Sequence, residues 1–201
     1  VDVSDEGGRF EGQDGTAVII RHKDNAALPA PLPTASMLRQ TVYGVDNQAT
    51  LDAIRAELST DREVVTGEDG SLSTVDNSGF ALKFQITCRR AFTGKNEQIN
   101  SPGFAPQRPV NEPGADDSYD IIPASLSHVV YFVPNIKEAE SFYIDRLGFR
   151  VADRFTQLGP FLRPQGTLDH HSLFLIDTPP HMQGCEHFTF HLAGPNELLL
   201  A

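Results

Sequence analysis

The chain has 201 residues, of which 39% are hydrophobic, enough to bury one large core or two small ones. Its formal net charge of -11 argues against nucleic acid and anionic membranes as partners, because the average surface would repel both. No apolar run approaches the roughly 20 residues of a membrane helix, and no secretory leader precedes the first expected strand. Two widely spaced cysteines, Cys88 and Cys185, favour free thiols in a reducing cytoplasm.

The first half of the chain is expected to contain one βαβββ unit. Residues 1–14 are polar and rich in glycine, which predicts a loop or a frayed end, and residues 15–21 form a short β-branched strand. Asp46 is the expected N-cap of the helix in the unit that follows. That unit consists of a strand at 37–45, a helix at 47–58 and strands at 63–66, 72–75 and 80–87.

The same order of elements repeats in the second half. Residues 91–122 hold Gly, Pro, Asn and Asp with little periodicity, which predicts a linker on the surface. The second unit then consists of a strand at 126–133, a helix from 136 to about 147, and strands at 149–155, 159–163 and 172–176. Gly148 is the expected C-terminal glycine of its helix.

Superposing the two units aligns their opening strands. A third copy begins at Cys185, and it places His187 where the second unit has His128. The chain therefore reads as the end of one unit, two whole units and the start of a fourth, truncated at both ends. Open units favour association into a homo-oligomer. The aligned pairs are Gln40 with His128, Tyr43 with Tyr131, and Asp46-Asn47 with Pro134-Asn135.

Two histidines at equivalent positions suggest a metal site. If the second and third copies pair about a pseudo-two-fold axis in one curved sheet, His128 and His187 meet on its concave side. Two neutral imidazoles supply two-thirds of the 2-His-1-carboxylate triad of non-haem iron enzymes. The alternative is that each is an ordinary half-buried histidine. Gln40 is no strong ligand and Lys83 stands near the expected carboxylate, so the first unit is predicted to be metal-free.

The remaining histidines differ in what they suggest. His171 opens a strand, where it could accept a proton beside a metal, or simply bond a backbone carbonyl. His170 faces the other side and reads as structural, and His181 lies in a loop. His22 and His191 carry no signal beyond composition.

Five segments carry a resemblance to a known family: LSHVV at 126–130, EAESFY at 138–143, RLGF at 146–149, DHHSLFL at 169–175 and EHF at 186–188. Together they resemble the vicinal oxygen chelate superfamily, and within it the type I extradiol ring-cleavage dioxygenases. The resemblance implies an α+β fold in which repeated βαβββ units form two modules of curved mixed sheet. It implies a non-catalytic N-terminal module at 1–90, a linker at 91–122 and a metal-binding module at 123–201.

The resemblance also implies a site and a reaction. His128 and His187 would ligate Fe(II), with Mn(II) possible, and His171 would be the acid/base histidine. The substrates would be a catechol-like aromatic diol and O2, with no further cofactor, as in aromatic catabolism. The third ligand, a glutamate, would fall after Ala201. No third ligand is assigned, because none of the nearby acidic residues stands at the right place: Asp153, Asp169, Asp177, Glu186 and Glu197.

Two other functions fit the same scaffold. A glyoxalase-like isomerase would draw acidic metal ligands from two modules and would not need a base at His171. A metal-free module of the drug-binding kind would bury an aromatic ligand between modules. Replacing His171 tests the first alternative, and metal analysis tests the second.

Overall fold

The computed structural model describes residues 2–34, 36–93, 97–114, 118 and 120–201. By its internal contacts the chain divides into two compact units. The first comprises Val1–Ile20, Arg89–Ser127 and Phe190–Ala201, and the second comprises Arg21–Cys88 and His128–Thr189. None of the helices in the described part is both long and apolar enough to cross a bilayer.

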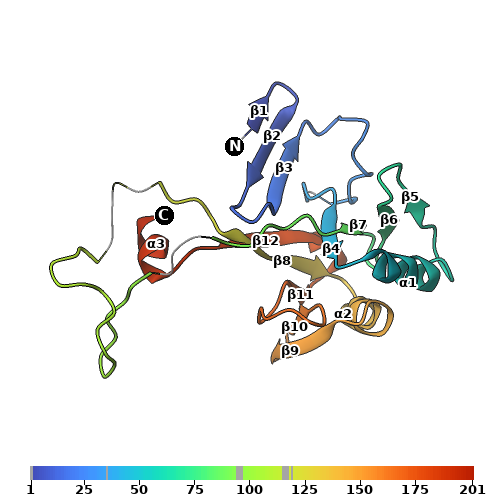
Figure 1. Cartoon of the computed structure of the whole chain (residues 1–201). Helices are drawn as coiled ribbons and strands as arrows, with labels where there is room; N and C mark the ends of the chain where they lie inside the picture. Colours follow the sequence, from blue (N-terminus) through green and yellow to red (C-terminus); the bar gives the residue numbers. More distant parts are fainter. Residues whose placement is uncertain (1, 35, 94–96, 115–117, 119) are drawn as a thin grey trace. The chain divides into compact units, whose positions relative to one another are not determined.

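The first unit contains a three-stranded sheet that the sequence predicted only in part. Strands β1 (Asp2–Ser4), β2 (Gly7–Glu11) and β3 (Ala17–Arg21) follow one another in the sheet (Figure 1). The prediction of a loop over residues 1–14 is therefore wrong. Glycines hid this hairpin, since they carry no side chain that could alternate, yet Val3 pairs with Gly8 through the backbone. The strand predicted at 15–21 is confirmed as β3.

The remainder of the first unit is mostly irregular. The described residues of 91–122 form neither helix nor strand. The chain ends in the short helix α3 (Pro195–Leu200), whose first turn is held by Glu97. The Glu97 carboxylate accepts hydrogen bonds from the backbone N–H groups of Asn196, at 3.0 Å, and Glu197, at 2.7 Å.

The second unit begins with a complete βαβββ repeat. It consists of β4 (Thr41–Val45), α1 (Gln48–Leu58), β5 (Val65–Thr66), β6 (Leu72–Val75) and β7 (Ala81–Ile86), with sheet order β4-β7-β6-β5. The N-cap is Asn47, not Asp46 as predicted: the Asn47 side chain accepts from Thr50 N at 3.0 Å. Asp46 instead accepts from the Thr50 hydroxyl at 2.7 Å. Asn47 takes the cap because its side chain reaches the free N–H of Thr50, the third residue of the helix.

The second repeat has the same plan. It consists of β8 (Ser125–Val133), α2 (Ile136–Ser141), a π-helical turn η1 (Phe142–Arg146), β9 (Arg150–Phe155), β10 (Gly159–Arg163) and β11 (Leu173–Asp177). Gly148 has φ +70°, as a C-terminal glycine should. A 3-10 turn, η2 (Pro180–Met182), leads to β12 (Gly184–His191), and the sheet order is β12-β8-β11-β10-β9.

Two details confirm that the repeats are copies of one plan. In each repeat the first strand pairs in parallel with the last, β4 with β7 and β8 with β11. Asn135 caps α2 by accepting from Glu138 N, as Asn47 caps α1. The predicted α+β fold of repeated βαβββ units is thus confirmed. The repeated plan puts β8 beside the strand that opens the next copy, β12.

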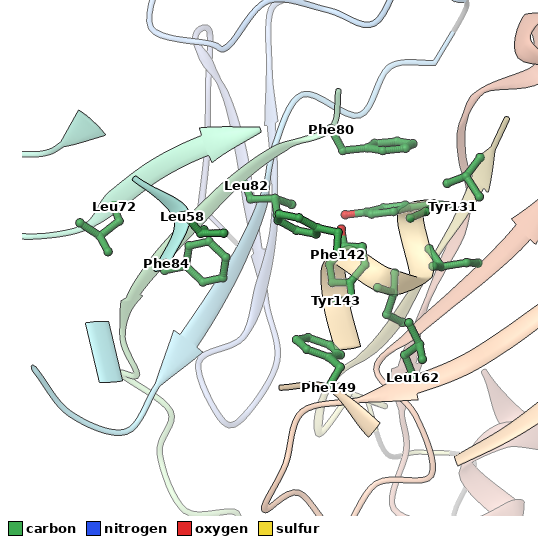
Figure 2. Close-up of a cluster of buried hydrophobic side chains, with 14 of the residues drawn as sticks. Leu58, Leu72, Phe80, Leu82, Phe84, Tyr131, Phe142, Tyr143, Phe149 and Leu162 are labelled. Carbon is green, nitrogen blue, oxygen red and sulfur yellow. The ribbon is translucent and has the colours of Figure 1, made fainter. Parts of the chain in front are cut away.

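Aromatic side chains from both repeats share the core of the second unit (Figure 2). Phe80 of the first repeat stacks on Tyr131 of the second with ring centroids 4.1 Å apart. Tyr143 meets Phe149 edge-on at 5.4 Å, and it is fully buried. Aromatic pairs of this kind add about 0.5–1.5 kcal/mol beyond the area that they bury. The repeats are therefore held together by a packed interior.

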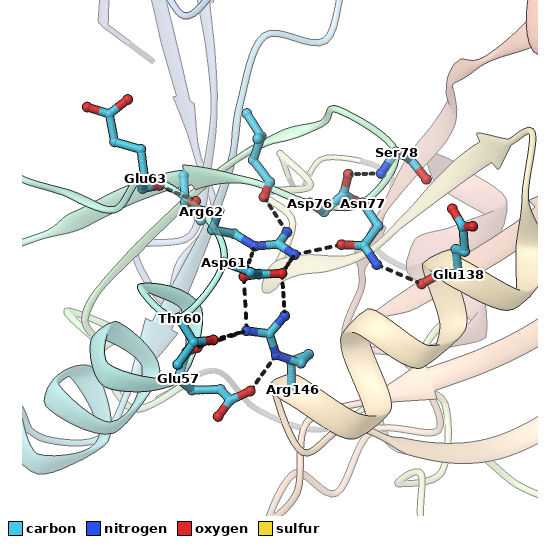
Figure 3. Close-up of polar contacts among 12 residues, drawn as sticks. Glu57, Thr60, Asp61, Arg62, Glu63, Asp76, Asn77, Ser78, Glu138 and Arg146 are labelled. Carbon is cyan, nitrogen blue, oxygen red and sulfur yellow. Dashed lines mark hydrogen bonds and ion pairs between the residues drawn. The ribbon is translucent and has the colours of Figure 1, made fainter.

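Arg146 joins the two repeats at the edge of this core (Figure 3). Its guanidinium donates to Asp61 at 3.0 and 3.1 Å, to Thr60 Oγ1 at 3.0 Å and to the backbone carbonyl of Glu57 at 2.8 Å. It also forms an ion pair with the Glu57 carboxylate. Asp61 and Glu57 raise the pKa of Arg146 above its ordinary value. Arg146 thus binds the carbonyl group of Glu57, near the C-terminal end of α1, from the neighbouring repeat.

Replacing Arg146 by alanine is expected to lower the free energy of unfolding by about 1–3 kcal/mol, because charged hydrogen bonds are lost at a side chain only 21% exposed. Urea denaturation followed by circular dichroism measures the change. Arg154 is the matched control, since its side chain is 54% exposed and pairs with Glu140 on the surface. An equal loss in Arg154→Ala would contradict the special role of Arg146.

Candidate metal centre

The candidate centre is built by two neighbouring strands, β8 and β12 (Figure 1). His128 on β8 and His187 on β12 bring their Nε2 atoms to 3.2 Å, although they are 59 residues apart. Two nitrogen ligands of one metal at about 2.1 Å lie roughly 3.0–3.4 Å apart when their angle at the metal is between about 90° and 109°. The observed distance therefore suits a shared cation.

The other ring nitrogens of this pair are held by neighbours on β12. Thr189 Oγ1 lies 2.9 Å from His128 Nδ1, and the Glu186 carboxylate contacts His187 Nδ1. When each Nδ1 carries the proton in these contacts, both Nε2 lone pairs face each other. Two lone pairs at that distance repel unless a proton or a cation lies between them. Ligating histidines in proteins are typically oriented in this way by partners on the second nitrogen.

The third ligand is the part of the centre that the described residues do not provide. Among them, no group of three or more His, Cys, Asp or Glu side chains is arranged to hold a metal. Glu186 is engaged with His187, and the Glu197 carboxylate accepts from Ala193 N at 2.8 Å. The nitrogen donors of His128 and His187 thus fit two of the three positions of a facial triad.

His171 lies beside the pair. Its ring centroid is 4.3 Å from that of His128 and 4.8 Å from that of Phe161. Burial lowers the pKa of His171, and the charges of His170 and His187 lower it further. The neutral form, which can accept a proton, is therefore favoured. All three histidines singled out in the sequence come together, and their chemical roles stay predictions.

Two features near His171 were not predicted from the sequence. His170, read as structural, lies with its Nδ1 3.0 Å from His171 Nδ1, so one of these nitrogens donates and the other accepts. Phe161 stacks on Phe174 at 4.1 Å while it meets the His171 ring edge-on. These two phenyl rings form an aromatic wall beside the histidines. Strand alternation alone gives no hint of it, because the two rings come from different strands.

The other histidines lie apart from this group. His191 bridges two serines of β8, with Ser125 Oγ 2.9 Å from its Nδ1 and Ser127 Oγ 2.9 Å from its Nε2. Both ring nitrogens are thereby engaged, which indicates a structural role. His181 is exposed in η2, and His22 is exposed near Asp24. Nothing in the sequence distinguished His191 from these two.

A cavity of about 200 Å³ lies away from the histidines. It belongs to the first repeat, where its lining includes Gln48, Asp69 and Gln85. Asp69 already accepts from Lys83 at 3.0 Å and from Ser71 N at 3.1 Å. The Asp69 carboxylate is therefore already engaged within the protein, and the geometry of the histidine group is the stronger indication of a site.

The second repeat and the strand that follows it match a known protein family. Residues 125–199 match the family model described as Glyoxalase/Bleomycin resistance protein/Dioxygenase superfamily, a stretch that includes all three clustered histidines. A curated relative, metapyrocatechase 2 of Cupriavidus necator, is 35% identical over 78 residues. That alignment covers 39% of this chain and 24% of the relative.

Solved structures share the fold at low sequence identity. The 2,3-dioxygenase LapB from Pseudomonas sp. KL28 gives a TM-score of 0.63 at 19% identity, covering 98% of this chain and 67% of that one. An Mn(II)-bound glyoxalase from Novosphingobium aromaticivorans gives 0.56 at 17% identity, covering 80% of this chain and 48% of that one. The expected vicinal oxygen chelate fold is confirmed, and residues 125–199 match the glyoxalase, bleomycin resistance protein and dioxygenase superfamily model.

Proposed function

We propose that the protein is an Fe(II)-dependent extradiol-type dioxygenase that opens the ring of a catechol-like aromatic diol. The observation that carries the proposal is the pair of Nε2 atoms of His128 and His187, 3.2 Å apart with both Nδ1 atoms held. The likeness of one stretch to metapyrocatechase 2 supports it. Association of copies into a homo-oligomer belongs to the same proposal.

The reaction would combine one diol with one O2. The carbon–carbon bond next to the diol breaks, both oxygen atoms enter the product, and no other reactant is consumed. When bound, Fe(II) would supply a Lewis acid, a template for the two substrates and a redox partner. His128 and His187 would hold it, and Mn(II) fits the same two nitrogens.

The chain's own groups would then handle the substrate and its proton. The Phe161 and Phe174 rings offer an apolar wall against which an aromatic ring can pack. His171, between this wall and His128, would accept a proton from a substrate hydroxyl and return it to the ring-opened product. Its position in contact with both groups is the reason for assigning it this role.

The direct test is anaerobic loading of the purified protein with Fe(II), followed by addition of O2 and a panel of catechols. Appearance of the yellow chromophore of a ring-opened product supports the proposal. Uptake of O2 measured with an electrode should match the product formed mole for mole. Metal uptake without ring opening of any catechol would contradict the proposal and favour the glyoxalase-like isomerase. Absence of metal uptake would favour the metal-free binding module.

Replacing His171 by phenylalanine is expected to reduce turnover about 10²- to 10⁴-fold while metal affinity stays unchanged, because only the proton-handling group is removed. Single-turnover kinetics and a metal titration measure the two effects separately. His181→Phe is the control, as this histidine is exposed in η2. Turnover that survives in the His171 variant would argue for an isomerase, which has no use for a base there.

A further inference from the structure

Two hydroxyl side chains of the segment that precedes β4 bind the beginning of β12. Thr34 Oγ1 donates to the backbone carbonyl of Gln183 at 2.6 Å. Ser36 Oγ accepts from the backbone N–H of Cys185 at 3.1 Å. Cys185 precedes His187 by two residues on the same strand. The segment that leads into the first repeat therefore contacts β12 close to the candidate ligand His187.

Gly184 allows this contact to be so close. A Cβ atom added at Gly184 would lie 2.6 Å from Ser36 Cβ, a separation that real Cβ atoms do not adopt. Its φ lies outside the left-handed region, so the backbone itself does not require glycine. Gly184 is also buried. The absence of a side chain is thus needed for the approach of Ser36, as at other positions where two backbones pass closely.

The position of β12 in its sheet makes such a contact important. In the described sheet, β12 is the edge strand and its neighbour is β8. An edge strand has ladder hydrogen bonds on one side, so its placement depends on contacts outside the ladder. A shift of a few tenths of an ångström at Cys185 would pass along the strand to His187. The fit of the two Nε2 atoms around one cation would then be lost.

We propose that Ser36, seated against Gly184, is a positioning residue that sets the distance between His187 and His128. This inference rests on the proposed metal centre. The competing explanation is that the contact merely helps to close the core of the second unit. The two explanations predict different effects of a substitution at Gly184. If the contact only closes the core, the substitution lowers the stability of the fold; if it positions His187, the substitution lowers the metal affinity.

The test is a pair of size changes that compensate each other. Gly184→Ala is expected to weaken Co(II) binding about 10- to 100-fold, the range observed when groups that orient a ligand are lost. Ser36→Gly removes the Cβ that the new alanine would meet. The double variant should therefore recover to within about threefold of Ser36→Gly alone, as coupled neighbours do in a double-mutant cycle. Co(II) absorption spectra report both affinity and ligand geometry.

Gly44→Ala is the matched control. Gly44 lies in β4 of the first repeat, and an added Cβ would come within 3.0 Å of the Thr87 side chain. This substitution should lower the thermal midpoint while leaving Co(II) affinity unchanged. Equal Co(II) affinity in Gly184→Ala and the wild type would overturn the proposal. So would a loss of affinity in Gly184→Ala that Ser36→Gly fails to repair.

A measurement without metal separates this inference from the proposed function. Imidazole NMR resonances of His128 and His187 should change in the metal-free Gly184→Ala protein, and in the double variant they should match those of Ser36→Gly alone. If they do so while the wild type binds no divalent metal, positioning stands and the dioxygenase proposal fails. If they are unchanged in Gly184→Ala, the positioning role fails even where the wild type opens catechols.

Discussion

Replacing either His128 or His187 by alanine is expected to abolish ring opening and to weaken Co(II) or Fe(II) binding by more than about 100-fold, beyond the loss caused by groups that only orient a ligand. Each variant removes one of two nitrogens that converge at 3.2 Å. Isothermal titration with Co(II), which is stable in air, measures the affinity. The fold should survive, because the His187 side chain is 45% exposed.

The residues that hold the Nδ1 atoms should give smaller losses. Thr189→Val keeps the shape of the side chain but removes the oxygen 2.9 Å from His128 Nδ1. Glu186→Gln removes the charge next to His187. Each is expected to weaken binding about 10- to 100-fold. His22→Ala, at an exposed loop position, is the control. Metal affinity within threefold of the wild type in His187→Ala would refute the assigned pair.

Replacing Asp76 by alanine is expected to cost about 3–5 kcal/mol of stability. Asp76 is 4% exposed, and its carboxylate accepts from Ser78 N at 2.8 Å, Phe80 N at 2.9 Å and the Tyr143 hydroxyl at 2.8 Å. Truncation leaves these three donors, two of them fully buried, without an acceptor, at about 1–3 kcal/mol for each buried donor before relaxation. Urea denaturation measures the loss. Asp52→Ala is the surface control, and a loss as small as that of the control would show that Asp76 is dispensable.

Asp76 also predicts how stability changes with pH. Burial raises the pKa of Asp76 to about 6, from 3.8, against the lowering effect of its hydrogen-bond donors and of Arg62. The folded state holds this proton more tightly than the unfolded chain does. Protonated Asp76 therefore stabilises the fold fully below about pH 4, and this stabilisation is lost as the pH rises to about 6. The shift corresponds to about 3 kcal/mol.

Asp76→Asn removes this titration and keeps the shape of the side chain. The stability advantage of the wild type over Asp76→Asn should therefore fall by about 3 kcal/mol between about pH 4 and about pH 7. Carboxylates whose pKa is lowered, such as those of Asp14 and Asp69, titrate equally in both proteins and cancel in the difference. A constant difference across this range would contradict the raised pKa.

The repeat was the part of the fold that sequence could predict. The two repeats, each a strand, a helix and three strands, predicted the elements from β4 to β11. The alignment of Asp46-Asn47 with Pro134-Asn135 also contained the two helix caps, Asn47 and Asn135. The convergence of His128 with His187 follows from the same duplication, since equivalent positions on paired opening strands come together. The cap itself was misplaced by one residue because Asp and Asn are both good caps.

Features that depend on contacts between the repeats were not predictable. Arg146 looks like any helix-terminal arginine until α1 of the other repeat comes beside it. Gly184 looks like a weak point in a strand, because its partner Ser36 lies 148 positions earlier in the chain. The β1–β2 hairpin was missed because its residues show no alternating hydrophobic pattern, and all three residues of β1 are exposed.

The strand order has a consequence for the making of the protein. β8 lies between β11 and β12, so both of its neighbours are synthesised after it. His187 follows His128 by 59 residues, which at about 5–20 residues per second corresponds to roughly 3–12 seconds on the ribosome. During the first part of that interval, until β11 has been synthesised, the apolar residues of β8 have no strand to pair with. The metal centre can assemble only after the strand that carries its second histidine has emerged.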